Sequence, residues 1–402
     1  MSKKKRVRHV LIVFHASYPE IKGGINKMIA TLAQAWIQDG IRVSILVPGG
    51  WEDREWSHRV HGAIQVHRQR LRLPWDRKKP LRGLLGWMME FPRVFWRLRQ
   101  FVRDQEVDLI HLHTPREDQY FFRLLHEFGG PPYVITFHGT DALHFSLGQI
   151  NHPGWMGWIV RGALGLTAVA RHYAALIERH HPGLAPVHFV ANGIDVAAGG
   201  PKEGSLPWLP EYFLIQVGWV EPPKAPDVTI RAWGLLQHRH PDLHLLLVGD
   251  QPYRQTGEPW YPGYVASLHA LIATLGCQDR VHWVGTVDQP TLHAIMQRSR
   301  GLVFPSRMEG MPYVLLEAGL VGLPVVCSDI PAFGEWIVDD VQGLLFPVDD
   351  HERLAAAVDR LMREEGLAQR IGQNLNRLVV EQHDAMTMAR HYIDLFNALL
   401  EK

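Results

Sequence analysis

The sequence predicts an α/β protein built from two Rossmann-like domains, each a doubly wound parallel sheet. Three observations support this prediction. The chain has 402 residues, enough for two or three domains. Short apolar runs alternate with helical patterns, as expected of parallel strands joined by crossover helices. The alternation stops once, in a segment rich in glycine and proline at 196–212, and then restarts. We therefore expect a linker near residue 200.

The first half of the chain begins with a buried strand in 9–16 and a helix in 24–40 that ends at a glycine. Further strands are expected in 42–50, 107–115, 133–141, 164–170 and 187–195. After the linker, strands are expected in 213–220, 243–250, 280–287, 301–306, 323–329 and 343–348.

The expected domains are 1–200, 201–384 and a final amphipathic helix, 385–402, that crosses back to the first domain. Ligands of open α/β sheets bind beyond the carboxyl ends of the strands. Two such sheets facing each other would form one deep cleft.

Composition narrows the class of protein. The formal net charge is +1, so the whole chain lacks the positive excess typical of nucleic-acid binding. Its two cysteines, Cys277 and Cys327, fit a reducing compartment. No run of about 18 uncharged apolar residues could span a bilayer. These features predict a cytoplasmic protein, soluble or peripheral on the cytoplasmic membrane face.

Two glutamates, Glu309 and Glu317, stand on either side of the run "GMPYVLL". Pro312 is well placed as the first residue of a helix that ends near Gly322. The free N–H groups of such a helix favour an anion, and a nearby carboxylate can accept hydrogen bonds from a ribose diol. The spacing alone leaves open the alternative of two glutamates on a solvated helix edge.

The wider sequence resembles a known family. The segment "PSRMEGMPYVLLEAGLVGLPVV" resembles the E-x7-E signature of the retaining glycosyltransferases of family 4, which have the GT-B fold. The segments "KGGINKMIATLA", "ITFHGTD", "VANGID" and "QVGWVEPPKAPDVTIRAW" resemble further family motifs in the family's order. Each motif is weak alone, but their joint order is specific and covers almost the whole chain.

The resemblance implies a role for each matching position. Glu317 would hold the nucleotide ribose, and Glu309 the hydroxyls of the donor sugar. His138 would contact the transferring sugar near the reaction centre, so His138 and Glu309 are the expected catalytic residues. Lys224 would neutralise the donor diphosphate without a metal ion or other cofactor. The remaining expected donor contacts are Gly23, Gly24, Gly218, Gly310, Met311 and Pro312, and the candidate acceptor or cleft residues are His111, His113, Asp141 and Asn192.

One position departs from the family pattern. Trp219 stands where the family has a phosphate-binding arginine, and Ala225 follows the lysine in place of a glycine. Loss of a guanidinium removes a strong charge-assisted contact, for which Arg307, Arg171 or another cation could substitute. The departure raises the alternative of a catalytically silent homologue that binds nucleotide sugar or scaffolds a membrane assembly. A sugar-nucleotide epimerase is a further alternative.

His111 and His113 lie on one face of a strand end, a pattern that could bind zinc. We favour the interpretation that both are ordinary strand-end residues near the cleft.

Residues 68–103 carry eleven Lys or Arg and two acids, interleaved with aromatic residues. One interpretation is a solvated helix that covers the first domain. The favoured one is a surface that contacts anionic membrane. Its expected contacts are Arg70, Arg72, Lys78, Lys79, Trp87 and Trp96. The predicted reaction moves a hexose-type sugar from a nucleoside-diphosphate sugar to a carbohydrate or lipid-linked acceptor, in polysaccharide or glycolipid synthesis.

Overall fold

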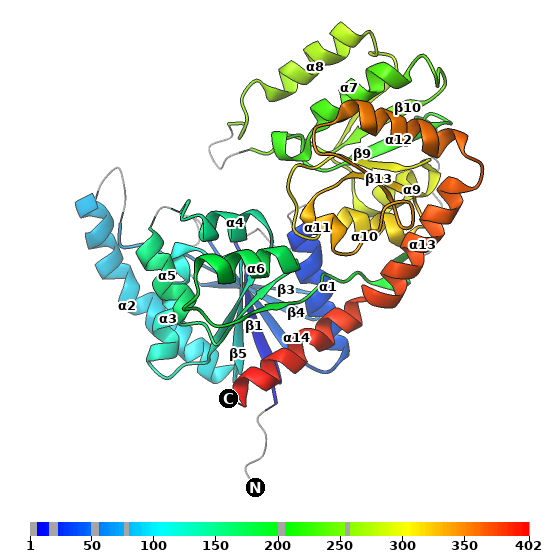
Figure 1. The fold of residues 1–402 in the computed structure, drawn as a ribbon. Helices are drawn as coiled ribbons and strands as arrows, with labels where there is room; N and C mark the ends of the chain where they lie inside the picture. Colours follow the sequence, from blue (N-terminus) through cyan, green and yellow to red (C-terminus); the bar gives the residue numbers. More distant parts are fainter. Residues whose placement is uncertain are drawn as a thin grey trace. The chain divides into compact units, whose positions relative to one another are not determined.

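The computed structural model describes residues 6–15, 23–49, 56–75, 80–150, 152–199, 206–253 and 258–401 (Figure 1). The chain divides into two compact units: unit 1 is Met1–Gly193 with Ala385–Lys402, and unit 2 is Ile194–Asp384. Unit 2 begins earlier than the expected residue 201. The reason is that the Ile194 N–H already donates a hydrogen bond to the His383 carbonyl, 2.8 Å away, at the far end of unit 2.

Unit 1 contains an eight-stranded sheet in the order β3-β4-β2-β1-β5-β6-β7-β8. The strands pair in parallel except for β3, which runs antiparallel to β4 at the sheet edge. The sequence did not predict this hairpin, whose two-residue turn contains Gly62 at φ 60°. The strand bounds are β1 His9–Val13, β2 Arg42–Pro48, β3 Ser57–His61, β4 Ile64–Gln69, β5 Leu109–His113, β6 Tyr133–Phe137, β7 Gly165–Ala168 and β8 Val187–Phe189.

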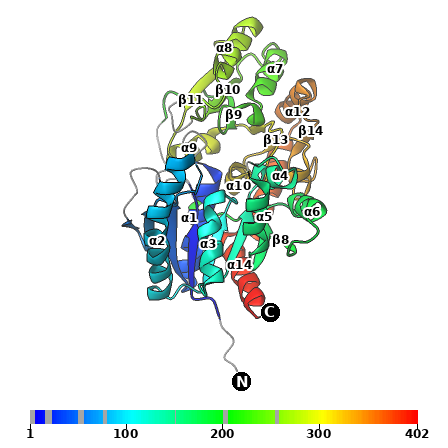
Figure 2. The same ribbon diagram turned by 90° about the vertical axis from the view of Figure 1, so that its left-hand side faces the viewer.

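Helices cover both faces of this sheet because neighbouring residues of a buried strand point to opposite sides. Ile110 and Leu112 of β5 join a core with Phe121. On the other face, His111 lies against Trp36 and Tyr392. The helices are α1 Gly24–Gln38, α2 Pro80–Asp104, α3 Tyr120–Glu127, α4 Thr140–Ser146, α5 Pro153–Arg161, α6 Arg171–His180 and α14 Ala385–Leu400, with the short 3-10 turn η1 Glu117–Gln119 (Figure 2).

Unit 2 contains a six-stranded parallel sheet in the order β11-β10-β9-β12-β13-β14. The strands are β9 Phe213–Val217, β10 His244–Val248, β11 Val281–Gly285, β12 Leu302–Phe304, β13 Val325–Ser328 and β14 Leu344–Phe346. The helices are α7 Pro226–Leu236, α8 Tyr264–Leu275, α9 Gln289–Arg298, α10 Tyr313–Leu320, α11 Pro331–Gly334, α12 His351–Arg363 and α13 Leu367–Gln382, and the 3-10 turns are η2 Val196–Gly199 and η3 Pro222–Lys224.

The helix predicted between the two glutamates is α10, with one correction at its start. Pro312 is the N-cap, with φ −70° and ψ 127°, and Tyr313 is the first helical residue. The extended ψ places Pro312 just outside the helix. Gly322, at φ 70°, follows the helix end as expected. Within the described part of the chain, no helix is long and apolar enough to cross a bilayer.

Candidate functional site

In unit 2, Lys224 and Glu309 form an ion pair at the carboxyl edge of the sheet. Lys224 ends the turn η3 after β9, and Glu309 lies in the loop between β12 and α10. The Lys224 Nζ lies 2.5 Å from the Glu309 Oε1. The two side chains are 21% and 9% exposed, so the pair is largely shielded from water. The sequence predicted both residues but not their contact, which leaves the lysine charge balanced by a carboxylate.

Glu317, in the second turn of α10, is only 1% exposed. Its Oε1 accepts a hydrogen bond from the Gln289 Nε2 at 2.6 Å. Gln289 is the first residue of α9, and its Nε2 also lies 3.1 Å from the His293 Nε2. Gln289, at the start of α9, therefore orients the Glu317 carboxylate. Sequence reasoning missed Gln289 because a glutamine after a strand carries no chemical signature of its own.

The turn after β9 packs against the end of β10. The Gly218 N–H donates to the Val248 carbonyl at 3.0 Å. At Gly249, φ is 138° and an added Cβ would collide with the Gly218 carbonyl oxygen, so both the backbone angle and the space require glycine. Trp219, at the departing position, is 38% exposed. Ala225 adopts a left-handed φ of 49°, the conformation that the usual glycine would favour.

Arg307, one of the two suggested substitutes for the missing arginine, is engaged by carboxylates. Its Nη2 donates to the Asp227 Oδ2 at 2.8 Å, and its Nε to the Asp349 Oδ1 at 2.6 Å. The Arg307 N–H also donates to the Pro223 carbonyl at 2.8 Å. Through these hydrogen bonds, Arg307 links η3 to the first turn of α7. Its guanidinium is thus paired with two carboxylates, as the Lys224 ammonium is with one, and its role as a substitute phosphate ligand stays a prediction.

The remaining predicted residues of unit 2 form the start of α10. Gly310, Met311 and Pro312 are all buried. Their backbone, rather than their side chains, is what the loop offers to a ligand. Their expected contact with a donor sugar, through backbone groups next to Glu309, stays a prediction.

In unit 1, Gly23 and Gly24 stand at the start of α1. Gly23 is the N-cap with φ 147°, an angle that L side chains rarely adopt. A Cβ at Gly23 would meet no atom within 4 Å among the described residues. The first N–H groups of α1 follow Gly23 directly, and the N-terminus of a helix favours an anion.

His138 follows β6 and bonds to the neighbouring strand. Its Nε2 lies 2.9 Å from the Nδ1 of His113, the last residue of β5. His111, two residues earlier, places its Nε2 2.7 Å from the Thr136 Oγ1. Burial lowers the pKa of His138 and of His111 to about 3, and the pKa of His113 well below its ordinary value. All three imidazoles are therefore neutral near pH 7.

The structure corrects the expectation that His111 and His113 line an acceptor site. Both side chains are 0% exposed, so neither reaches the surface. For the zinc alternative, the described ranges contain no group of three or more His, Cys, Asp or Glu side chains that could hold a metal ion. The two histidines instead lie in the interior of unit 1, where His113 contacts His138.

Asp141 and Asn192, the other candidate cleft residues, have different surroundings. The Asp141 carboxylate accepts hydrogen bonds from the N–H groups of His138, Gly139 and Ala142, and thereby closes the turn before α4. Burial raises the pKa of Asp141 to about 6, although these backbone N–H groups oppose the shift. Asn192 is 6% exposed, so it lies inside unit 1 rather than on its surface.

The residues predicted to contact a membrane have different surroundings and different exposures. The Arg72 Nη1 donates to the Glu90 Oε1 at 2.9 Å, and the Arg70 Nη1 lies 3.7 Å from the same atom. These two side chains are only 14% and 11% exposed. The Trp87 Nε1 donates to the Tyr120 hydroxyl at 2.7 Å. Trp96 is 64% exposed, and Lys78 and Lys79 lie outside the described residues.

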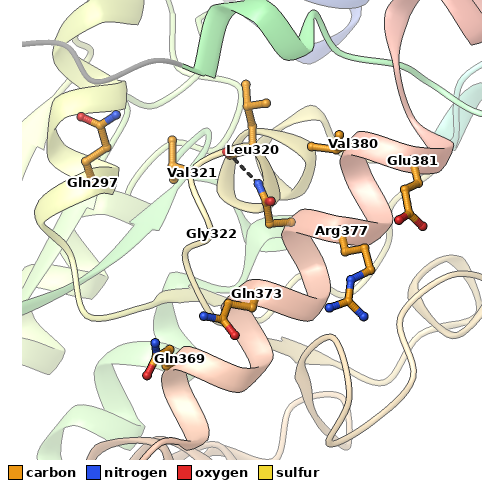
Figure 3. A pocket seen from close by; sticks show the side chains of 10 residues that line it. Gln297, Leu320, Val321, Gly322, Gln369, Gln373, Arg377, Val380 and Glu381 are labelled. Carbon is orange, nitrogen blue, oxygen red and sulfur yellow. Dashed lines mark hydrogen bonds between the residues drawn. The ribbon is translucent and has the colours of Figure 1, made fainter.

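A pocket of about 770 Å³ lies elsewhere on unit 2, at the C-terminal end of α10 (Figure 3). Gln369, Gln373 and Arg377 of α13 line one side of it, and Gln297 lies across from them. Glu309, Gly310, Met311 and Pro312 precede α10 at its opposite, N-terminal end. None of the residues that line the pocket is a predicted donor residue.

Comparison with known proteins relates both halves of the chain to sugar-transferring proteins. The family model described as Glycosyltransferase Family 4 matches residues 22–198, and the one described as Glycosyl transferases group 1 matches residues 204–378. A glycogen synthase of Mycobacterium tuberculosis is 30% identical over 278 residues, which cover 66% of this chain and 63% of that protein. The chain thus spans less than two thirds of that relative. A phosphatidyl-myo-inositol mannosyltransferase of Mycolicibacterium smegmatis is 25% identical, covering 87% of this chain and 83% of that protein.

Solved structures share the fold. A sucrose-phosphate synthase from Thermosynechococcus elongatus superimposes with a TM-score of 0.75 at 18% identity, covering 98% of this chain and 99% of that one. Anabaena Alr3699/HepE in complex with UDP-glucose gives a TM-score of 0.73 at 17% identity, covering 97% and 99%. The predicted GT-B fold, with a Rossmann-like parallel sheet in each half, is thereby confirmed.

Proposed function

The chain belongs to glycosyltransferase family 4, and from this premise we propose that it transfers a hexose-type sugar from a nucleoside diphosphate to an acceptor. The observation that carries the proposal is the contact between Lys224 and Glu309. It brings the cation expected at the diphosphate next to the carboxylate expected at the sugar, at the carboxyl edge where ligands of such sheets bind.

Donor binding would exchange partners in this ion pair. A diphosphate offers Lys224 more negative charge than one carboxylate does, and Glu309 is then free to accept hydrogen bonds from sugar hydroxyls. The buried carboxylate of Glu317, oriented by Gln289, would accept the ribose hydroxyls. The N–H groups at the start of α1, beside Gly23, would add positive potential to the leaving diphosphate.

We propose that the reaction keeps the anomeric configuration and needs no metal ion. Lysine and backbone N–H groups would supply the stabilisation of the leaving group, and the diphosphate itself would take the acceptor proton. The anomeric configuration of the product, read by proton NMR before mutarotation, tests retention. Activity should be the same with and without a chelator of divalent cations.

Calorimetric titration of UDP, GDP, ADP and TDP tests the donor site. We expect one nucleotide to bind wild type, and Glu317→Gln to bind it about 10- to 100-fold more weakly because a charge-assisted hydrogen bond is lost. Glu352→Gln, an exposed change in the same unit, is the matched control and should bind like wild type. If none of the four nucleotides binds and no sugar transfer is seen, the catalytically silent homologue replaces this proposal. Trp219, in place of the family's arginine, is the observation that favours it.

We also propose that the acceptor is presented at an anionic membrane, by way of α2. Arg70 and Arg72 lie close to Glu90 and are mostly buried, so we propose other residues for the contact with the membrane. Large apolar side chains of α2 stand exposed on one side of the helix, where spacings of three, four and seven residues align most of them. They are Leu81, Leu85, Met88, Met89 and Trp96, which are 57% to 82% exposed. A relative named as a phosphatidyl-myo-inositol mannosyltransferase supports a lipid acceptor.

Co-sedimentation with vesicles tests this contact. The protein should bind anionic vesicles at low salt, and Leu85→Ser with Met89→Ser should reduce binding because less apolar surface enters the interface. Val380→Ser, at a 42% exposed position of α13, is the control for loss of exposed apolar area elsewhere. Binding that is equal in wild type and in the α2 variant would contradict the proposal.

A further inference from the structure

We propose that His113 is a positioning residue that fixes the tautomer of His138, so that His138 presents an uncharged Nδ1–H group to the donor sugar. The identity of the ligand rests on the proposed function, whereas the tautomer rests on the geometry of unit 1 alone. The two can therefore fail separately.

The contact is built by two neighbouring strand ends. His113 ends β5 and His138 immediately follows β6, and the two strands pair in parallel with His113 opposite Thr136. The imidazole planes are inclined by only 25°, and the ring centroids lie 5.1 Å apart. The 2.9 Å separation of the His113 Nδ1 and the His138 Nε2 is a hydrogen-bond distance.

This bond can be made in two ways. Because burial keeps both imidazoles uncharged, each ring carries one hydrogen, and only one of the two facing nitrogens can hold it. Either the His113 Nδ1–H donates to the His138 Nε2, or the His138 Nε2–H donates to the His113 Nδ1. The two arrangements place opposite groups at the far nitrogens of both rings.

The His113 Nε2, the ring nitrogen that does not face His138, decides between these two arrangements of the hydrogen bond. The His113 Nε2 is buried and has no hydrogen-bond partner among the residues that the structure describes. If His138 were the donor, this nitrogen would carry a hydrogen with nothing to receive it. Orphaned buried N–H groups are rarer than unsatisfied acceptors. The favoured arrangement has His113 donating from Nδ1, which leaves only a lone pair at Nε2 and puts the hydrogen of His138 on its Nδ1.

Packing holds His113 in this orientation. Its ring lies 4.1 Å from the ring of His111 and 6.4 Å from that of Phe14, measured between centroids. His111 is itself anchored to Thr136. With Nε2 bonded internally, Nδ1 is the ring nitrogen that His138 has left for a ligand. It donates to a sugar oxygen and takes no proton near neutral pH, which leaves the role of base to another group.

A pair of variants of matched shape tests the positioning role. In His113→Asn, the side-chain amide can present an N–H where Nδ1 lies. In His113→Leu, the same branched shape offers no hydrogen bond. We expect the leucine variant to lower kcat/KM for sugar transfer roughly 5- to 30-fold, mostly through kcat, and the asparagine variant to recover most of that loss. Nucleotide binding should be unchanged in both. Equal losses in both variants would overturn the positioning role.

The tautomer is measured without reference to activity. Nitrogen-15 spectra of histidine-labelled protein distinguish protonated from unprotonated ring nitrogens, and His138→Gln assigns the resonances by their loss. We expect the hydrogen of His138 on Nδ1 in wild type and a mixture of tautomers in His113→Leu. A hydrogen on Nε2 in wild type overturns the inference. If no sugar is transferred from any nucleotide, the proposed function fails while this spectrum still decides the tautomer.

Discussion

Acidification to pH 5.5 should destabilise unit 1 strongly, because burial lowers the pKa of several of its histidines, four of them far below the ordinary value. His67 is 5% exposed, His111 and His113 are 0% exposed, and His138 is partly buried. Burial lowers the pKa of His67 to about 4 and of His111 and His138 to about 3, with His113 well below the ordinary value. In the unfolded chain each has a pKa of about 6.5.

The sign and size of the effect follow from proton linkage. Between the folded and unfolded pKa values, the unfolded chain binds more protons, so stability is complete above pH 6.5 and falls as the pH decreases. At pH 5.5 each of the four histidines lowers the free energy of unfolding by about 1.4 kcal/mol. Asp141, whose folded pKa is raised to about 6, opposes this by about 0.8 kcal/mol. The net loss is about 5 kcal/mol, a large part of the 5–15 kcal/mol typical of a whole protein.

Hydrogen exchange with mass spectrometry, corrected for the intrinsic effect of pH, measures this loss for each unit separately. Peptides from β5 and β6 should lose about 5 kcal/mol of protection between pH 7.5 and 5.5. Peptides from β9 and β12 are the internal control and should lose less, since His244 and His282, two unit 2 histidines of lowered pKa, are more exposed than the four in unit 1 that contribute most. A loss below about 1 kcal/mol in β5 and β6 would refute the assignment of buried uncharged imidazoles.

Three substitutions should give distinct results in urea unfolding. His67→Phe should stabilise unit 1 and reduce its acid sensitivity by about 1.4 kcal/mol at pH 5.5, because both ring nitrogens of His67 are buried without a partner among the described residues; unchanged acid sensitivity would contradict this. Gly249→Ala should destabilise unit 2 by more than about 2 kcal/mol, since its Cβ would meet the Gly218 carbonyl, and wild-type stability would show that the turn relaxes at little cost. Arg307→Lys should lower the free energy of unfolding of unit 2 by about 1–2 kcal/mol, because a lysine cannot donate both guanidinium hydrogen bonds to Asp227. An equal loss in Arg307→Ala would show that the positive charge alone contributes nothing.

Much of the fold could be read from the sequence, because buried parallel strands appear as short apolar runs between helical patterns. The strands around Leu112 and Ile135 are examples. The β3–β4 hairpin was missed. Its strands carry many polar and charged residues at the sheet edge, so hydrophobic periodicity gives little signal there. The resemblance suggested roles for residues that local patterns could not identify, and those roles stay predictions.

Contacts between distant side chains could not be predicted. Nothing in the sequence joins Gln289 to Glu317 or Arg307 to Asp349, since these pairs depend on the exact positions of helix starts and loops. The same holds for His111 and His113. Alternation along a strand gives the shared face but not what covers it, and Tyr392 from the final helix lies over His111.

The division of unit 1 between two stretches of sequence has a consequence for how the protein is made. Helix α14 supplies Tyr392 and Phe396, both 0% exposed, and its Ala389 carbonyl accepts a hydrogen bond from the Trp36 Nε1 at 3.0 Å. During translation, the part of unit 1 that precedes unit 2 therefore lacks one of the helices that cover its sheet until all of unit 2 has been synthesised. Unit 2 is continuous and can fold first, although it comes later in the chain. A nascent chain stalled before residue 385 would expose Trp36 and should recruit chaperones for apolar surface.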